Sequence, residues 1–208
     1  MHFLISLSRK IDTINEKIGN NISWALLLAV IICTLNSVAR YALNSSSNAW
    51  MEIQWYLYGA VFLLVAPYTL QQNGHVRIDV VAGRFSKRTQ VWIDLFGFVF
   101  FLLPMAGLIL YLGVPYAWRS YTRHEMSGNA GGLIEWPAKI LIPLGFALLL
   151  AQGFSEIIKR IAYLRGHTDA SSFDKHAKTA AEEVEELRLA NADKLRDQSG
   201  DQERGGQA

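Results

Sequence analysis

The sequence contains a single cysteine, Cys33, among its 208 residues. One thiol cannot form an intramolecular disulfide, and a cysteine-based metal cluster needs several thiolates. Both a disulfide-stabilised scaffold and a cysteine metal centre are therefore excluded. Cys33 lies inside an apolar run, where cysteine usually packs as a small apolar residue.

Charged residues are also scarce. They make up 18% of the chain, against about 25% in a typical soluble protein. The two parts of the chain differ in sign, because residues 1–165 carry a net charge of +6 and residues 166–208 carry −4. Four long apolar runs lie in the first part. We therefore expect an all-α membrane protein with a polar, acidic C-terminal tail.

Histidine is absent from the apolar runs, since the five histidines lie at positions 2, 75, 124, 167 and 176. A membrane b-type cytochrome needs axial ligands that project inside its helix bundle. The sequence also lacks an H-E-x-x-H motif and a glycine-rich phosphate loop with its lysine. We expect a protein that is not an enzyme, with no cofactor, no metal site and no nucleic-acid partner.

Each apolar run is long enough to cross a bilayer, for which a helix needs about 20 residues. The four expected spans are 22–43, 50–70, 91–114 and 136–158. They form one transmembrane domain over residues 20–165. An amphipathic segment (1–19) precedes this domain, and the polar tail (166–208), either helical or disordered, follows it.

Three prolines, Pro67, Pro104 and Pro143, lie inside the expected spans. They should bend these helices rather than end them, because no water is present in the hydrocarbon to compete for the freed carbonyl groups. Pro137 lies at a helix start, where its missing N–H costs nothing.

Lysine and arginine are divided unevenly between the two sides of the spans. Ten lie on one side: Arg9, Lys10, Lys17, Arg77, Arg84, Lys87, Arg88, Lys159, Arg160 and Arg165. The other side has Arg40, Arg119 and Arg123, with Lys139 just inside the fourth span. Cytoplasmic loops carry the excess of basic residues. Both termini should therefore be cytoplasmic, and the connections near 44–49 and 115–135 should face the opposite compartment.

Two segments outside the spans are amphipathic. In the first, apolar residues recur at steps of three and four on one helical face: Leu4, Leu7, Ile11, Ile14 and Ile18. We expect this segment to lie on the inner membrane surface, with a simple helical continuation of the first span as the alternative. In the second, Ile78, Val81, Ala82 and Phe85 share a face. This segment is either a second surface helix or an ordinary basic loop.

Ionisable residues occur only near the ends of the spans: Arg40, Glu52, Asp94, Glu135 and Lys139. Such groups are functional candidates by default, but a transport pathway needs polar groups across the full thickness of the membrane. Here the middle layers are apolar, so anchoring of helix ends is the favoured interpretation. Arg40 and Glu52 should lie at similar depth and form part of a polar network.

Small residues recur at steps of four along the first span: Ala25, Ala29, Cys33 and Ser37. Small residues allow close helix approach in lipid. Another span of the same chain could fill this smooth surface, or a partner subunit could pack there.

Three short motifs connect the spans. Asn48, Trp50 and Glu52 enter the second span, and His75, Arg77 and Asp79 follow it. The stretch S-G-N-A-G-G-L over 127–133 leads to the fourth span and contributes Asn129, Gly131 and Gly132 before Trp136. With these motifs, residues 20–165 resemble the small membrane subunit (DctQ-type) of tripartite ATP-independent periplasmic (TRAP) transporters. The chain departs from many members at Ile53, where they carry a second acidic residue.

The resemblance implies a role that composition cannot give. In such systems a periplasmic solute-binding protein captures an organic acid, and a large multi-span subunit moves it inward with sodium. The small subunit braces the large one, and the motifs hint weakly at 2-oxo acids and related carboxylates. Two other classes stay open: an accessory subunit of a membrane redox enzyme, and a self-sufficient small transporter. Membrane lipid is a partner in every case.

Overall fold

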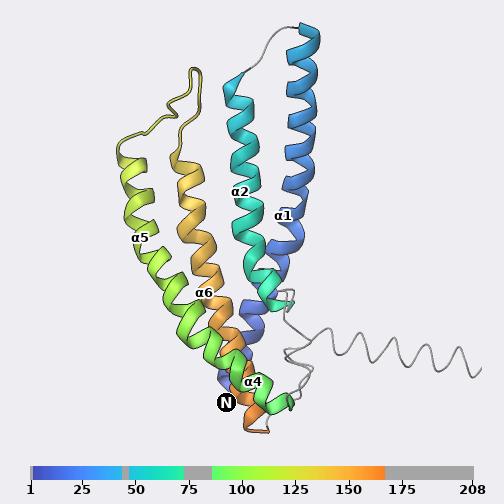
Figure 1. The fold of residues 1–208 in the computed structure, drawn as a ribbon, viewed down its shortest axis with the longest axis vertical. Helices are drawn as coiled ribbons and strands as arrows, with labels where there is room; N and C mark the ends of the chain where they lie inside the picture. Colours follow the sequence, from blue (N-terminus) through green and yellow to red (C-terminus); the bar gives the residue numbers. More distant parts are fainter. Residues whose placement is uncertain (1, 44–46, 73–85, 167–208) are drawn as a thin grey trace, which may run out of the picture.

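The computed structural model describes residues 2–43, 47–72 and 86–166 and is all-α over these parts (Figure 1). Its elements are α1 His2–Leu43, α2 Asn48–Gln71, α4 Lys87–Gly97, the π-helix η1 Phe98–Leu102, α5 Leu103–Thr122 and α6 Trp136–Leu164. Helices α4, η1 and α5 run on without a break. Four helices are long and apolar enough to cross a membrane: Leu4–Ala42, Asn48–Gln71, Lys87–Thr122 and Trp136–Leu164. The predicted fold class is confirmed.

The helices extend beyond the apolar stretches that predict them. The third spanning helix covers 87–122 rather than 91–114, and α6 continues to Leu164 rather than to about 158. Helix α1 passes through the expected boundary near residue 19 without interruption, as the alternative of a continued first span requires. The extension of α6 carries Lys159 and Arg160, which pair with Asp12 of α1 and Asp94 of α4, so this helix persists where hydropathy ends.

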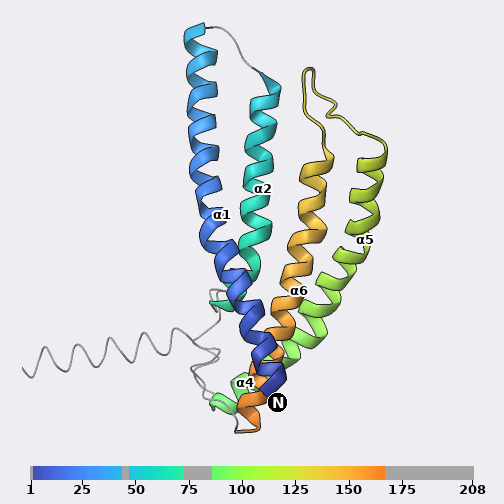
Figure 2. The same ribbon diagram turned by 180° about the vertical axis from the view of Figure 1, so that it is seen from behind.

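Helices α1 and α2 form one antiparallel pair, and α5 and α6 form the other (Figures 1 and 2). Helix α6 joins the pairs because it packs on α2 and, where the N-terminus lies, also on α1. We call this the N-terminal end of the bundle, and the opposite one the loop end. The backbones approach closely where α6 crosses α2: a Cβ at Gly145 would lie 2.8 Å from the carbonyl oxygen of Leu63. Such contacts are typical of helix packing in lipid.

The four small residues of the first span do not share one environment. Ala29 is fully buried and Ala25 half-buried, whereas Cys33 and Ser37 are exposed. The buried side of α1 continues from Ala29 to Ile32, and so follows steps of three and four rather than strict fours. Ala29 therefore packs inside the chain, and Cys33 and Ser37 lie on a face that the described part of the chain leaves uncovered.

The prolines interrupt no spanning helix. Pro67 and Pro143 lie inside α2 and α6, and Pro137 occupies the first turn of α6, as the sequence predicts. Pro104 lies two residues after the end of η1 at Leu102, and the N–H of Leu103 between them donates to the carbonyl of Phe98, five residues back. A π-turn is a common way for a helix to accommodate a local irregularity.

Candidate functional site

The residues that the sequence singles out at the loop end converge on the carboxylate of Glu52, which is 4% exposed. It accepts hydrogen bonds from the Ser127 hydroxyl, from Asn129 Nδ2 at 2.9 Å and from the Leu133 N–H at 2.6 Å. We call these four residues the Glu52 latch. It joins α2 to the loop between α5 and α6, and therefore ties one helix pair to the other.

The loop has the shape that the latch requires. The N–H of Ser127 donates to the Leu133 carbonyl at 2.9 Å, and the N–H of Gly132 donates to Asn129 at 3.0 Å. Gly131 has φ of +71°, a conformation that glycine adopts without steric cost. A Cβ at Gly132 would lie 2.6 Å from Cβ of Ser127 and 2.8 Å from Oε1 of Glu52. Glycine is thus favoured at 131 by the backbone conformation and at 132 by the close approach of Ser127 and Glu52.

Two further side chains of α2 bind the same loop. Asn48 Nδ2 donates to the Ala130 carbonyl at 3.0 Å, and the Tyr56 hydroxyl donates to the Ile134 carbonyl at 3.3 Å. Trp50 instead is half exposed, as expected for a residue at a membrane interface. Trp136 packs edge-on against Tyr121, with ring centroids 5.4 Å apart.

Lys139 fastens the loop to α6. Its Nζ lies 2.6 Å from Glu125 and 2.7 Å from Glu135, and 4.9 Å from the centroid of the Tyr116 ring. The hydrogen bond from Lys139 lowers the pKa of the Glu125 carboxyl below its ordinary value of 4.5. The interpretation of these charges as anchors of helix ends agrees with this arrangement.

The expectation that Arg40 belongs to the polar network of Glu52 is wrong. A polar network does surround Glu52, but its donors come from the loop, and Arg40 is exposed. Three donors already occupy both carboxylate oxygens, so Glu52 needs no cation. The residues that complete the network are separated from Glu52 by 75 to 81 positions in the sequence.

A second polar cluster lies at the N-terminal end, between α1 and α6. Hydrogen bonds join Ser8 to Ser155 at 2.6 Å and Asn15 to Gln152 at 2.7 Å. Asp12 accepts from Gln152 and Ser155, each at 2.9 Å, and from Lys159 at 3.1 Å. We call these six residues the polar clasp.

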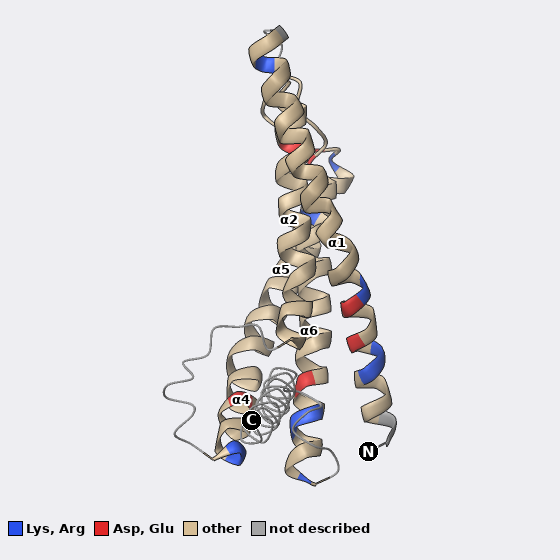
Figure 3. Cartoon of the chain, turned by 90° about the vertical axis from the view of Figure 1, so that its right-hand side faces the viewer, with Lys and Arg blue, Asp and Glu red and all other residues tan. Residues whose placement is uncertain are grey.

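A buried ionic group extends the clasp to α4. Glu156 accepts from both Lys159 and Arg160, and Arg160 also lies 3.3 Å from Asp94. The Arg160 guanidinium is fully buried and stacks 4.5 Å from the centre of the Phe98 ring. Figure 3 shows the positions of charged residues, coloured along the ribbon of several helices near this end. The clasp and the ionic group therefore join α1, α4 and α6 at the N-terminal end of the bundle.

Asp94 is a candidate from the sequence, but its partner Arg160 and the residues of the polar clasp were not predicted to contact one another. A usable signal was present, because Ser8, Asp12 and Asn15 recur at steps of four and three on one face of α1. Gln152, Ser155 and Lys159 recur in the same way on α6.

Other sequence candidates lie outside the described residues. These are His75, Arg77 and Asp79, the second amphipathic segment (78–85) and the polar tail beyond residue 166.

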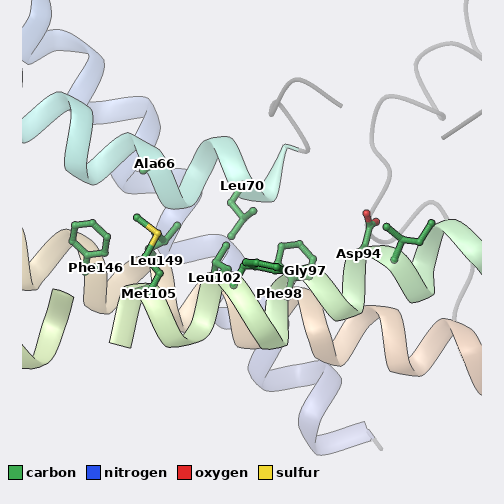
Figure 4. Close-up of a pocket in the computed structure, with 12 residues that line it drawn as sticks. Ala66, Leu70, Asp94, Gly97, Phe98, Leu102, Met105, Phe146 and Leu149 are labelled. Atoms are coloured by element: carbon green, nitrogen blue, oxygen red, sulfur yellow. The ribbon is translucent and has the colours of Figure 1, made fainter. Parts of the chain in front are cut away.

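An apolar groove of about 570 Å³ lies over α6, between α2 and the α4–η1–α5 helix (Figure 4). Its lining includes Leu70, Phe98, Met105 and Phe146, and Asp94 lies at one end. Among the residues that the structure describes, no set of polar groups converges in it. The described parts of the chain also hold no group of three or more histidine, cysteine or carboxylate side chains placed to bind a metal ion.

These features define a class: a polytopic helical membrane protein whose polar residues fasten helices to one another. A family model described as "Tripartite ATP-independent periplasmic transporters, DctQ component" matches residues 29–162. The chain therefore belongs to the DctQ family and is the small permease component of a TRAP transporter, not an enzyme. Its family is part of a tripartite complex with a large membrane subunit and a periplasmic binding protein. No curated protein matches the chain.

Proposed function

We propose that this chain braces the large membrane subunit of a sodium-coupled secondary transporter for organic acids in the bacterial inner membrane. The observation that carries the proposal is the placement of its polar contacts. The Glu52 latch fastens the helix pairs at the loop end, and the polar clasp fastens them at the N-terminal end. A bundle held at both ends resists relative movement of its helices, which suits a support.

The interior between the two clusters supports the same conclusion. The buried residues there are apolar or small, such as Ala29, Ala106 and Gly145. A self-sufficient transporter needs a polar site near the middle of the membrane, usually where helices are broken. The spanning helices that the structure describes run through this region without such a site. Solute and sodium would then be bound by the large subunit.

We predict that this chain alone transports nothing. Proteoliposomes that contain it without the large subunit should show no sodium-driven uptake of carboxylates. Vesicles with both membrane subunits and the binding protein should take up the solute. The measurement is accumulation of labelled 2-oxo acids and related carboxylates under an imposed sodium gradient. Sodium-dependent uptake by the isolated chain would refute the bracing role.

Both termini would face the cytoplasm, in line with the excess of lysine and arginine at that end. The loop end would then face the periplasm and the solute-binding protein. We predict that a cysteine at Ser46 or Asn129 reacts with an impermeant thiol reagent added to the periplasmic side, and that one at Ser86 does not. The background must be Cys33→Ser, because Cys33 is exposed. The reverse labelling pattern would invert the proposed orientation.

A further inference from the structure

The N-terminal part of α1 turns its polar side, rather than its apolar side, toward the bundle. Ser8 and Asn15 are buried against α6. The apolar stripe of this segment, Leu4, Leu7, Ile11, Ile14 and Ile18, lies beside them on the helix surface. Three of its members are 42%, 42% and 53% exposed: Leu4, Leu7 and Ile14. Ile11 and Ile18 are half-buried, so the described chain covers the apolar stripe only in part.

Lipid hydrocarbon cannot cover the whole stripe if α1 continues along the bundle. Gly19 packs against the Tyr68 ring, one turn before α2 ends at Gln71. Helix α2 has 24 residues, or about 36 Å, which already exceeds the hydrocarbon thickness of about 30 Å. Residues 4–18 add roughly 20 Å beyond this level, whereas each headgroup layer is only about 6 Å thick. Leu4 and Leu7 thus extend past the lipid.

The stripe has the spacing of a helix–helix contact. Its members recur at steps of three and four, the repeat by which apolar side chains interlock between two helices. Lys10 and Lys17 flank it on the side away from α6, and both are exposed. Their positions correspond to those that select an acidic partner in paired helices. A matching helix would carry a short apolar stripe bordered by carboxylates.

The chain itself contains such a sequence. Ala180, Val184 and Leu187 recur at steps of four and three, and four glutamates surround them at positions 182, 183, 185 and 186. We propose that residues 180–195 of the acidic tail dock as a helix on the apolar stripe of α1. The carboxylates would then face Lys10 and Lys17, and the docked helix would cover the apolar stripe.

Connectivity makes this docking easy. Helix α6 ends at Leu164 at the same end of the bundle as the stripe (Figure 1). The residues from 167 to 179 can span about 40 Å when extended, which is more than the length of the stripe. A tethered segment is present at an effective concentration on the order of millimolar. A contact with an intrinsic Kd of about 0.1 mM would therefore be occupied about tenfold more often than empty.

Thiol reactivity at Ile14 tests the docking. In a Cys33→Ser background, Ile14→Cys in open membrane fragments should react about tenfold faster with a polar maleimide once the chain is ended after Ser172. The matched control is Glu16→Cys, which lies on the exposed charged face of the same helix and should react equally in both chains. An unchanged rate at Ile14→Cys on removal of the tail would overturn the proposal, whether lipid or another protein covers the stripe.

Cross-linking of the full-length chain gives an independent test. Ile14→Cys and Leu187→Cys should be joined within one chain by a short bifunctional maleimide, whereas Glu16→Cys and Leu187→Cys should not. Charge reversal by Lys10→Glu and Lys17→Glu should weaken the cross-link, and replacement of the four glutamates by lysine in that background should restore it. Cross-links between two chains, or a yield independent of these charges, would contradict docking of the tail.

Discussion

Glu52→Gln is expected to loosen the attachment of the 123–135 loop to α2. Glutamine keeps the shape of the side chain but replaces one acceptor oxygen by an NH₂ group, so a donor of the latch loses its partner. Hydrogen bonds to an ionised acceptor are roughly twice as strong as neutral ones, and the latch loses that charge. The open form of the loop should therefore become more populated, on the order of tenfold. Cleavage of the loop, without any insertion, by a limiting amount of a broad-specificity protease measures this population, because cleavage follows opening when reclosure is fast.

Arg40→Ala is the control for this prediction. Arg40 is exposed and is not among the partners of Glu52. The single substitution should leave loop cleavage unchanged, and the double variant should match Glu52→Gln alone. An effect of Arg40→Ala as large as that of Glu52→Gln would show that Arg40 pairs with Glu52, and would contradict the latch.

Gly145→Ala is expected to force α2 and α6 apart. The added Cβ would lie 2.8 Å from both the Cβ and the carbonyl oxygen of Leu63. A backbone atom cannot rotate away, so the helices must separate along their contact. Overpacking of this kind costs about 1–3 kcal/mol. The melting temperature of the purified complex should fall, and the two helix pairs should become less tightly joined.

Gly107→Ala is the matched control, and its effect on the melting temperature should have the opposite sign. Gly107 lies inside α5, and its added Cβ would meet nothing within 4 Å. Alanine is favoured over glycine in a helix by about 0.5–1 kcal/mol. This variant should keep or slightly raise the melting temperature. Equal losses from both substitutions would show that glycine as such, rather than the crossing at Leu63, matters.

The sequence predicts the spans well because one physical quantity determines them. Any helix that crosses the hydrocarbon must be apolar along its length, whatever its neighbours are. Hydropathy does not predict where the helices end, because the ends depend on contacts with residues of other helices. The extension of α6 to Leu164, for example, carries Lys159 and Arg160, whose carboxylates come from α1, α4 and α6 itself.

The two polar clusters illustrate what local patterns leave undetermined. The motif around Asn48 and Glu52 and the one around Asn129 are recognisable separately, but nothing in their spacing shows that they bind each other. Arg40 offered a simple electrostatic partner at similar depth, and the structure uses neutral donors instead. At the other end, the side of α1 that faces the bundle is the polar one, which reverses the usual inference from amphipathicity.

The π-turn before Pro104 shifts the helical phase of the third spanning helix by one residue. In α5 the buried positions are Ala106, Gly113, Ala117 and Ser120. A regular α-helix would extend this face back to positions 99, 96 and 92, yet Val99, Phe96 and Trp92 are exposed. Phe98 and Val91, each one position earlier than 99 and 92, are instead the inward positions, since Phe98 packs on Arg160 of α6 and Val91 is buried. Asp94 lies between them and also contacts Arg160. A comparison with another DctQ sequence that lacks this turn therefore needs a one-residue gap between the two halves of the helix. Without that gap, an alignment would match the lipid-facing residues of one protein to the interface of the other.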